Sequence, residues 1–177
     1  MFVKILIAVV VLVVGVVVLV ASRPAEFRVT RSATIAAPPS VVFAQVNDFR
    51  NWKGWSPWEK RDPAMKSTHE GASTGAGAAY SWVGNKDVGE GRMTIVESKP
   101  DEFIRIKLEF FKPMAATHTA EFTFKPEGSG TSVTWNMYGK NNFMSKAFQL
   151  VMSMDKMVGG DFESGLSQMK TVAEAAK

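Results

Sequence analysis

Apolar residues recur at intervals of three and four through the last third of the chain, residues 141–176. This spacing is typical of one buried face of an amphipathic helix. A single helix over this range would be about 50 Å long, longer than a domain of about 150 residues is wide, so we expect a break. Ser153 and Asp155 are natural N-caps for a second piece, and Gly159 and Gly160 weaken that piece. The apolar stripe consists of Phe143, Ala147, Leu150, Val151, Met154, Val158, Phe162, Leu166, Met169, Val172, Ala173 and Ala176.

Most segments before this region alternate between apolar and polar residues, which predicts strands with one buried face. The first strand is expected at residues 27–35, followed by a helix that begins at Pro39 and by a second short helix. Six further strands, separated by turns that contain Gly or Pro, are expected at residues 65–70, 78–83, 89–98, 103–111, 116–125 and 132–138.

Consecutive strands joined by short turns form an antiparallel sheet. Each strand has one apolar face, so we expect the sheet to be covered on one side only, by the C-terminal helix. The sequence therefore predicts an α+β fold, in which a curved antiparallel sheet of about seven strands wraps around a long helix. The space between sheet and helix is where a ligand would sit.

An uninterrupted apolar run occupies residues 5–21, with Lys4 before it and Ser22-Arg23-Pro24 after it. Its length reaches the lower limit for crossing a bilayer. We favour an uncleaved transmembrane anchor over residues 1–22. The alternative is a cleavable signal peptide, whose apolar region is normally shorter and precedes an Ala-x-Ala site. Positive charges lie on both sides and guide the orientation weakly. We expect a single-pass membrane protein with its soluble domain, residues 23–177, on the extracytoplasmic side.

The order of elements resembles the helix-grip fold of the START/Bet v1-like superfamily, also called SRPBCC. Local motifs are similar to its bacterial polyketide cyclase/dehydrase and lipid-transport branch, over about residues 27–175. The resemblance implies an interior cavity for a hydrophobic molecule and carries no shared catalytic motif, since this fold hosts many functions. The matching motifs are Ile35-Ala36-Ala37-Pro38-Pro39-Ser40-Val41-Val42-Phe43, Val46-Asn47-Asp48-Phe49 with Trp52, Trp55, Pro57 and Trp58, Gly89-Glu90-Gly91, and Gly160-Asp161-Phe162-Glu163-Ser164-Gly165-Leu166 with Lys170.

Composition narrows the range of functions. The formal net charge is +4 and the basic residues are scattered, whereas nucleic-acid binding needs a clustered basic patch. The chain has no cysteine, which excludes disulfides, zinc–thiolate sites and cysteine nucleophiles. We see no sequence cluster of Asp, Glu or His, so we expect neither a metal nor another cofactor.

Two residues are candidates for acid–base chemistry. His118 lies on the apolar face of its strand, where a hydrogen-bonded wall residue is the favoured interpretation. Glu90 lies between Gly89 and Gly91, which indicates a bulge or a close backbone approach, and we expect its carboxylate at a solvated edge. Nothing marks a nucleophile beside either residue, so we assign no catalytic residue.

Trp52, Trp55 and Trp58 lie within seven residues of one another. A carbohydrate site or a membrane-surface contact is one interpretation. We favour packing of the two short helices against the sheet and the long helix, because Trp buries a large apolar area.

Alternation also predicts which side chains line the cavity, although it does not give the register between strands. We expect a monomer that binds a hydrophobic or lipid-like molecule close to the membrane. One alternative is a cyclase or hydrolase that uses His118 or Glu90. Another is an interaction module like the family branch that activates a heat-shock chaperone's ATPase. The predicted lining is Tyr80, Trp82, Met93, Ile106, Leu108, His118, Phe122, Trp135, Met137, Phe162 and Leu166.

Overall fold

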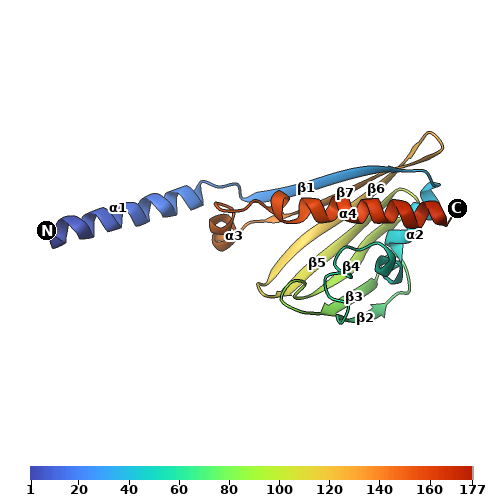
Figure 1. Cartoon of the computed structure of the whole chain (residues 1–177), viewed down its shortest axis with the longest axis horizontal. Coiled ribbons are helices and arrows are strands. Elements are labelled where there is room, and N and C mark those ends of the chain that lie inside the picture. The colour runs from blue at the N-terminus through green and yellow to red at the C-terminus, as the bar shows by residue number, and fades with distance from the viewer. Residues whose placement is uncertain (177) are drawn as a thin grey trace.

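The computed structural model describes residues 1–176. It contains one seven-stranded antiparallel sheet, a long helix that lies across one face of that sheet, and an apolar N-terminal helix that projects away from the domain (Figure 1). In chain order the elements are α1 (Phe2–Ala21), β1 (Glu26–Ile35), α2 (Pro39–Asn47), the 3₁₀ helix η1 (Phe49–Gly54), β2 (Lys66–Gly71), β3 (Ala78–Val83), β4 (Glu90–Lys99), β5 (Phe103–Lys112), β6 (Ala116–Glu127), β7 (Gly130–Lys140), α3 (Phe143–Phe148) and α4 (Met154–Ala175).

The sheet has the order β1-β7-β6-β5-β4-β3-β2, and every neighbouring pair is antiparallel. Strands β2 to β7 therefore form a meander, and β1 pairs with the last strand. This arrangement confirms the predicted α+β helix-grip fold. Each predicted strand is present, and β7 is the one whose ends extend furthest beyond the prediction.

The two glycines that flank Glu90 have separate roles. Gly89 adopts a positive φ of 65°, a conformation that a residue with a Cβ rarely adopts. A Cβ on Gly91 would collide with the indole of Trp82. The register between β4 and β5 shifts between Glu90 and Gly91. Both the predicted bulge and the predicted close approach are present.

Two aromatic side chains of the Trp-rich segment anchor the short helices. Asp48 caps η1 by accepting a hydrogen bond from the backbone N–H of Arg50. The indole N–H of Trp52 donates to the carbonyl of Val46 in α2 at 3.1 Å. The indole N–H of Trp55 donates to the carbonyl of Gln45, also in α2. Both indoles are buried, which confirms the packing interpretation for these two residues.

The predicted break in the C-terminal helix is present. Residues 149–153 separate α3 from α4, and the Ser153 hydroxyl caps α4 by accepting from the Lys156 N–H. The helix then runs through Gly159 and Gly160 without interruption. It buries the later part of the predicted stripe, Phe162, Leu166, Met169 and Ala173.

The prediction is wrong for the first part of the stripe. Phe143 is 51% exposed and Val151 is 86% exposed, because the break directs α3 away from the sheet and against the end of α1. Val20 of α1 is buried there, and the Lys146 ammonium donates to the Ala21 carbonyl at 3.3 Å. A cation suits the C-terminus of a helix, so this contact holds α3 at the point where α1 ends.

Candidate ligand site

The sheet aligns its inward-facing side chains in rows, because residues directly opposite each other on antiparallel strands share a face. One row runs across Val29, Met137, Ala120, Ile106 and Ile95. All five side chains are buried. This row forms the centre of the face that α4 covers.

The next row toward α1 differs from the first in its exposure. Phe27 and His118 both oppose Gly139, and Leu108 opposes His118 and Met93. Phe27, Met93, Leu108 and His118 are only partly buried. The ladder continues to Tyr80 on β3, which is buried. We call Phe27, His118, Leu108 and Met93 the open row.

His118 has an apolar environment. Phe27 and Phe110 make edge contacts with the imidazole, with ring centroids 4.9 and 5.6 Å away. Gly139 leaves room for the ring, since a Cβ there would lie 2.6 Å from the imidazole Cδ2. Burial lowers the pKa of His118, which favours the neutral imidazole.

The imidazole also has a free polar atom. Among residues 1–176, His118 Nδ1 is shielded from solvent and has no hydrogen-bond partner. Leaving such an atom unpaired costs free energy that a partner would recover. A ligand group that pairs with Nδ1 would be oriented by the only polar side chain of the open row.

Aromatic rings occupy the space between α4 and the part of the sheet that lies farther from α1 than the open row. Trp135 of β7 stacks on Phe162 of α4, with ring centroids 3.9 Å apart. Trp55 and Phe122 lie against Trp135 at 5.6 and 4.9 Å, and Trp58 makes an edge contact with Phe162 at 6.4 Å. All of these rings except that of Trp58 are buried. This half of the interior is therefore filled by side chains, and the open row is the accessible half.

An ion-pair cluster fixes α4 over β1. The Arg31 guanidinium donates to Glu163 at 2.6 Å and to Asp155 at 2.8 Å. These two hydrogen bonds raise the pKa of Arg31, and the one to Asp155 has the larger effect. The Arg31 guanidinium likewise lowers the pKa of Asp155. The cluster sets the position of the first three turns of α4 relative to the open row.

The outer strands hold two of the predicted residues through polar contacts. Tyr80 donates to Glu59 at 2.8 Å. Burial, followed by this hydrogen bond, raises the pKa of its hydroxyl. The Trp82 indole donates to the Val88 carbonyl at 3.0 Å. Both side chains are thus fixed by the protein itself.

The eleven predicted lining residues fall into two groups. Eight are buried, among them Tyr80, Trp82 and Phe122, and Met93, Leu108 and His118 are partly buried. The strand residues share one sheet face, which Phe162 and Leu166 cover from α4. Two surface hollows, of about 230 and 490 Å³, are lined by other residues, at η1 with β2 and β3 and at Arg61 with Lys86 and Asp87.

Glu90 does not reach this face. It pairs with Lys112 at 2.7 Å and lies opposite Val83 on β3. Val83 is exposed whereas the neighbouring Trp82 is buried, so Glu90 lies on the outer side of the sheet. Within residues 1–176, no three Asp, Glu or His side chains come together in a group that could hold a metal ion.

Sequence reasoning missed two members of the site. Phe27 and Phe110 contact His118, and alternation placed both on the apolar faces of their strands. Only the register brings them to one imidazole. The signal that could have pointed to them was their bulk at the ends of two strands that turn out to reach the same end of the sheet.

A family model described as polyketide cyclase/dehydrase and lipid transport matches residues 26–174. The chain belongs to this family. The match covers the whole sheet and nearly all of α4 and excludes α1. No curated protein matches the sequence.

Several solved structures share the fold of this family member. Protein SA2116 from Staphylococcus aureus matches with a TM-score of 0.62 and 17% identity, over 85% of this chain and 95% of that one. The Aha1 dimer from Colwellia psychrerythraea matches with a TM-score of 0.60 and 12% identity, over 85% and 98%. The di-domain ARO/CYC StfQ from the steffimycin biosynthetic pathway matches with a TM-score of 0.60 and 12% identity, over 85% of this chain but only 51% of that one. At these identities the likeness shows the fold alone.

Proposed function

We propose that this protein is a membrane-anchored domain that binds a hydrophobic or lipid-like molecule between its sheet and α4. The observation that carries the proposal is the open row. It is apolar and partly exposed, and it includes one unpaired polar atom, His118 Nδ1. Pockets for small molecules commonly combine apolar walls with a few orienting polar groups.

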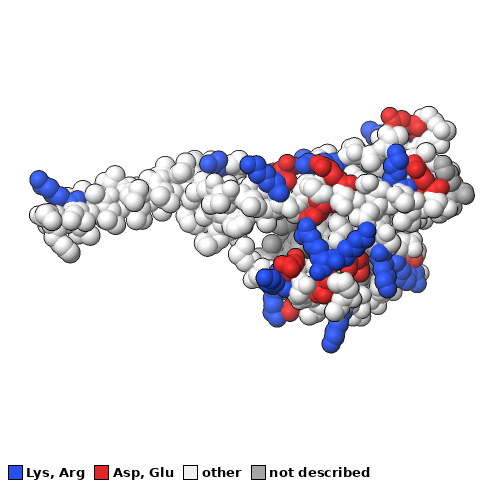
Figure 2. Space-filling view, viewed as in Figure 1, with Lys and Arg blue, Asp and Glu red and all other residues white. Residues whose placement is uncertain are grey.

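The length, hydropathy and exposure of α1 support its role as a membrane anchor. It has 20 residues and a mean hydropathy of 3.3, and it is the one helix in residues 1–176 that is long and apolar enough to cross a membrane. Its side chains are nearly all exposed to solvent, whereas a core helix of a soluble domain would be covered. Figure 2 shows the body of α1 without charged side chains, in contrast to the domain.

The family description supports an apolar ligand, since it includes both lipid transport and polyketide cyclases. We favour binding over catalysis. Glu90 lies on the outer side of the sheet, so it does not complete an acid–base pair with His118. Tyr80 and Trp82 already have partners within the protein. Trp135 Nε1 has no partner within residues 1–176, but this ring stacks on Phe162 in the filled half of the interior, so His118 is the residue that would orient a ligand at the open row.

The second candidate function is an interaction module, and the aromatic packing favours it. Trp55, Phe122, Trp135 and Phe162 fill the deeper half of the interior. A domain whose interior is entirely occupied would act through its surface. The open row distinguishes the two candidates, because only the binding function needs it to accept a molecule.

Native mass spectrometry of the full chain, extracted in mild detergent from the membranes in which it is expressed, tests the binding function. We expect a population of chains that carry one apolar molecule each. Leu108→Trp should remove that population by filling the open row, and Lys107→Trp, which adds the same ring on the opposite side of β5, should retain it. The binding function is wrong if the wild type carries nothing. The mass of the apo chain also distinguishes an anchor from a cleaved signal peptide.

A further inference from the structure

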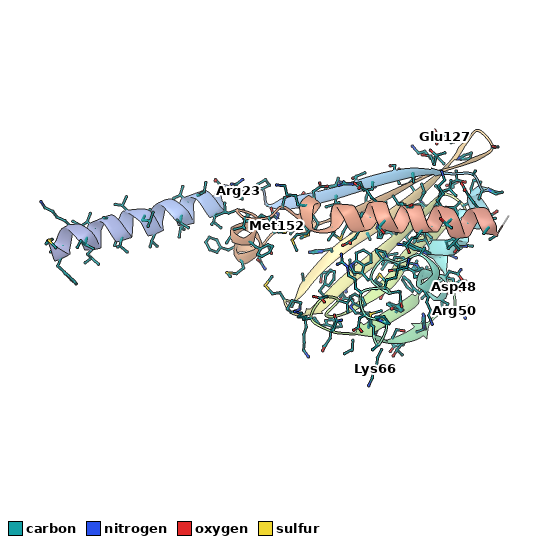
Figure 3. The ribbon with its side chains drawn as sticks, viewed as in Figure 1. Arg23, Asp48, Arg50, Lys66, Glu127 and Met152 are labelled. Atoms are coloured by element: carbon teal, nitrogen blue, oxygen red, sulfur yellow. The ribbon has the colours of Figure 1, made fainter. Side chains whose placement is uncertain are left out.

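Exposed apolar side chains gather where α1 meets the domain. Phe143, Met144 and Phe148 of α3 are at least half exposed, and Val151 and Met152 continue the set. We call these five residues the junction patch. Figure 3 shows Met152 and Arg23 at the end of the domain from which α1 projects. A soluble domain rarely exposes so many large apolar side chains together without a partner.

The end of β5 and the turn that follows it also expose large apolar side chains, at the end of the sheet nearest α1. Phe111 and Met114 are 54% and 58% exposed. The antiparallel order places this turn at the end where β1 begins and β7 finishes. Figure 1 shows the turn and α3 on the side of the domain that faces α1.

The open row reaches the same end. Phe27 is the second residue of β1 and His118 the third of β6. The turn between β6 and β7, with Glu127 beside it, lies at the opposite end (Figure 3). The exposed apolar surface and the accessible half of the candidate site therefore share one end of the domain.

The position of α3 relative to α1 identifies the partner. A helix of 20 residues is about 30 Å long, which matches the hydrocarbon core of a bilayer. The contacts of Val20 and Lys146 hold α3 at the terminus of that helix. If α1 spans the bilayer, α3 lies at the level where the chain leaves it, and Arg23 and Lys146 lie among lipid headgroups.

We propose that the junction patch and Met114 rest in the interface of the bilayer and dock the open end of the site against it. The partner is a lipid surface. The proposal rests on the anchor of the proposed function. An amphipathic surface of this kind binds by burying its apolar side chains at the boundary between headgroups and acyl chains. An apolar ligand would then move between bilayer and site without crossing water.

The absence of cysteine from the chain allows one fluorophore to be placed at a time. The full chain would carry Met144→Cys or Met114→Cys, labelled with a nitrobenzoxadiazole probe, in vesicles of phosphatidylcholine and phosphatidylglycerol. Lipids with a doxyl group near the headgroup would serve as quenchers. Val11→Cys in the middle of α1 reports insertion of the anchor, and Ser129→Cys in the β6–β7 turn reports water.

We expect a blue-shifted emission and strong quenching at positions 144 and 114, and neither at position 129. The proposal is overturned if the probes at 144 and 114 behave like the one at 129 while doxyl groups near the bilayer centre quench the probe at 11. That result would leave the anchor intact. A blue-shifted emission without lipid quenching would mean that a second copy of the chain covers the patch, and would overturn it too. An unquenched probe at 11 would refute the anchor itself.

Discussion

The indole of Trp135 lies flat on the ring of Phe162, with centroids 3.9 Å apart and planes 6° apart. One ring belongs to β7 and the other to α4, so the stack joins the two layers of the domain. Gly165 permits this approach, since a Cβ there would lie 3.0 Å from Cζ3 of Trp135. The spacing between helix and sheet is therefore fixed at this contact, and the row from Val29 to Ile95 separates it from the open row.

Phe162→Ala should lower the free energy of unfolding by about 3–5 kcal/mol, because it removes a buried ring and leaves a cavity. Met157→Ala is the matched control in the same helix, since Met157 is 42% exposed, and it should cost about 0.5 kcal/mol or less. Thermal unfolding of the full chain in mild detergent, followed by circular dichroism, measures both. Equal losses would contradict the assignment of Phe162 to the joint between the layers.

The adjacent glycines of α4 should respond unequally to substitution by Ala. A Cβ at Gly159 would collide with the Arg31 guanidinium, whereas a Cβ at Gly160 meets nothing within 4 Å. Gly159→Ala should therefore stabilise the protein less than Gly160→Ala, because it displaces Arg31 from Asp155 and Glu163. Gly160→Ala should stabilise it by up to about 1 kcal/mol, because Ala is the better helix former. The same unfolding measurement compares the two variants, and equal stabilities of Gly159→Ala and Gly160→Ala would refute the packing of Arg31 on α4.

Alternation alone identified which residues of β1 and of β3 to β7 share the face that α4 covers, and the helical spacing identified Phe162 and Leu166. Both patterns can be read within a single strand or helix, because burial of one face requires apolar residues at regular positions along that element. The rows across the sheet were not predictable, since they depend on register, which brings Phe27 and Phe110 to His118 from separate strands. The exposure of Phe143 and Val151 was missed for another reason. Helical spacing does not show that the helix of Phe143 packs at the end of α1, nor that Val151 lies in the break between α3 and α4.

Stability should depend on pH through His118. Burial lowers the pKa of this imidazole from the ordinary value of 6.5. As the pH falls through 6.5, the unfolded chain binds a proton that the folded chain does not, so stability decreases. The free energy of unfolding stops decreasing once the pH is below the pKa of His118 in the folded chain, because both states then carry the proton. His118→Gln should flatten the dependence of the unfolding midpoint between pH 8 and pH 5.

His69→Gln is the control for the pH experiment, since His69 is exposed. It should leave the slope unchanged. The comparison concerns slopes, because His118→Gln also changes packing and shifts the midpoint at every pH. A slope that persists without His118 would show that another group is responsible.

Residues 22–177 should fold without α1. The sheet, α2, η1 and α4 all lie after Ala21, and so does every residue of the hydrophobic core cluster, which suffices for a domain of this length. A chain without residues 1–21 should be a soluble monomer that unfolds cooperatively, as size-exclusion chromatography and calorimetry would show. Aggregation in every detergent-free buffer would contradict this expectation.

Binding of a fluorescent fatty-acid analogue by the full chain in mild detergent tests the central claim most directly. The wild type should show saturable binding, since burying apolar surface contributes about 25 cal/mol per Å². His118→Ala should weaken binding through the loss of the orienting imidazole. Leu108→Trp should abolish binding, while Lys107→Trp should bind like the wild type. Absence of saturable binding by the wild type, or equal binding by both Trp variants, would contradict an apolar ligand site at the open row.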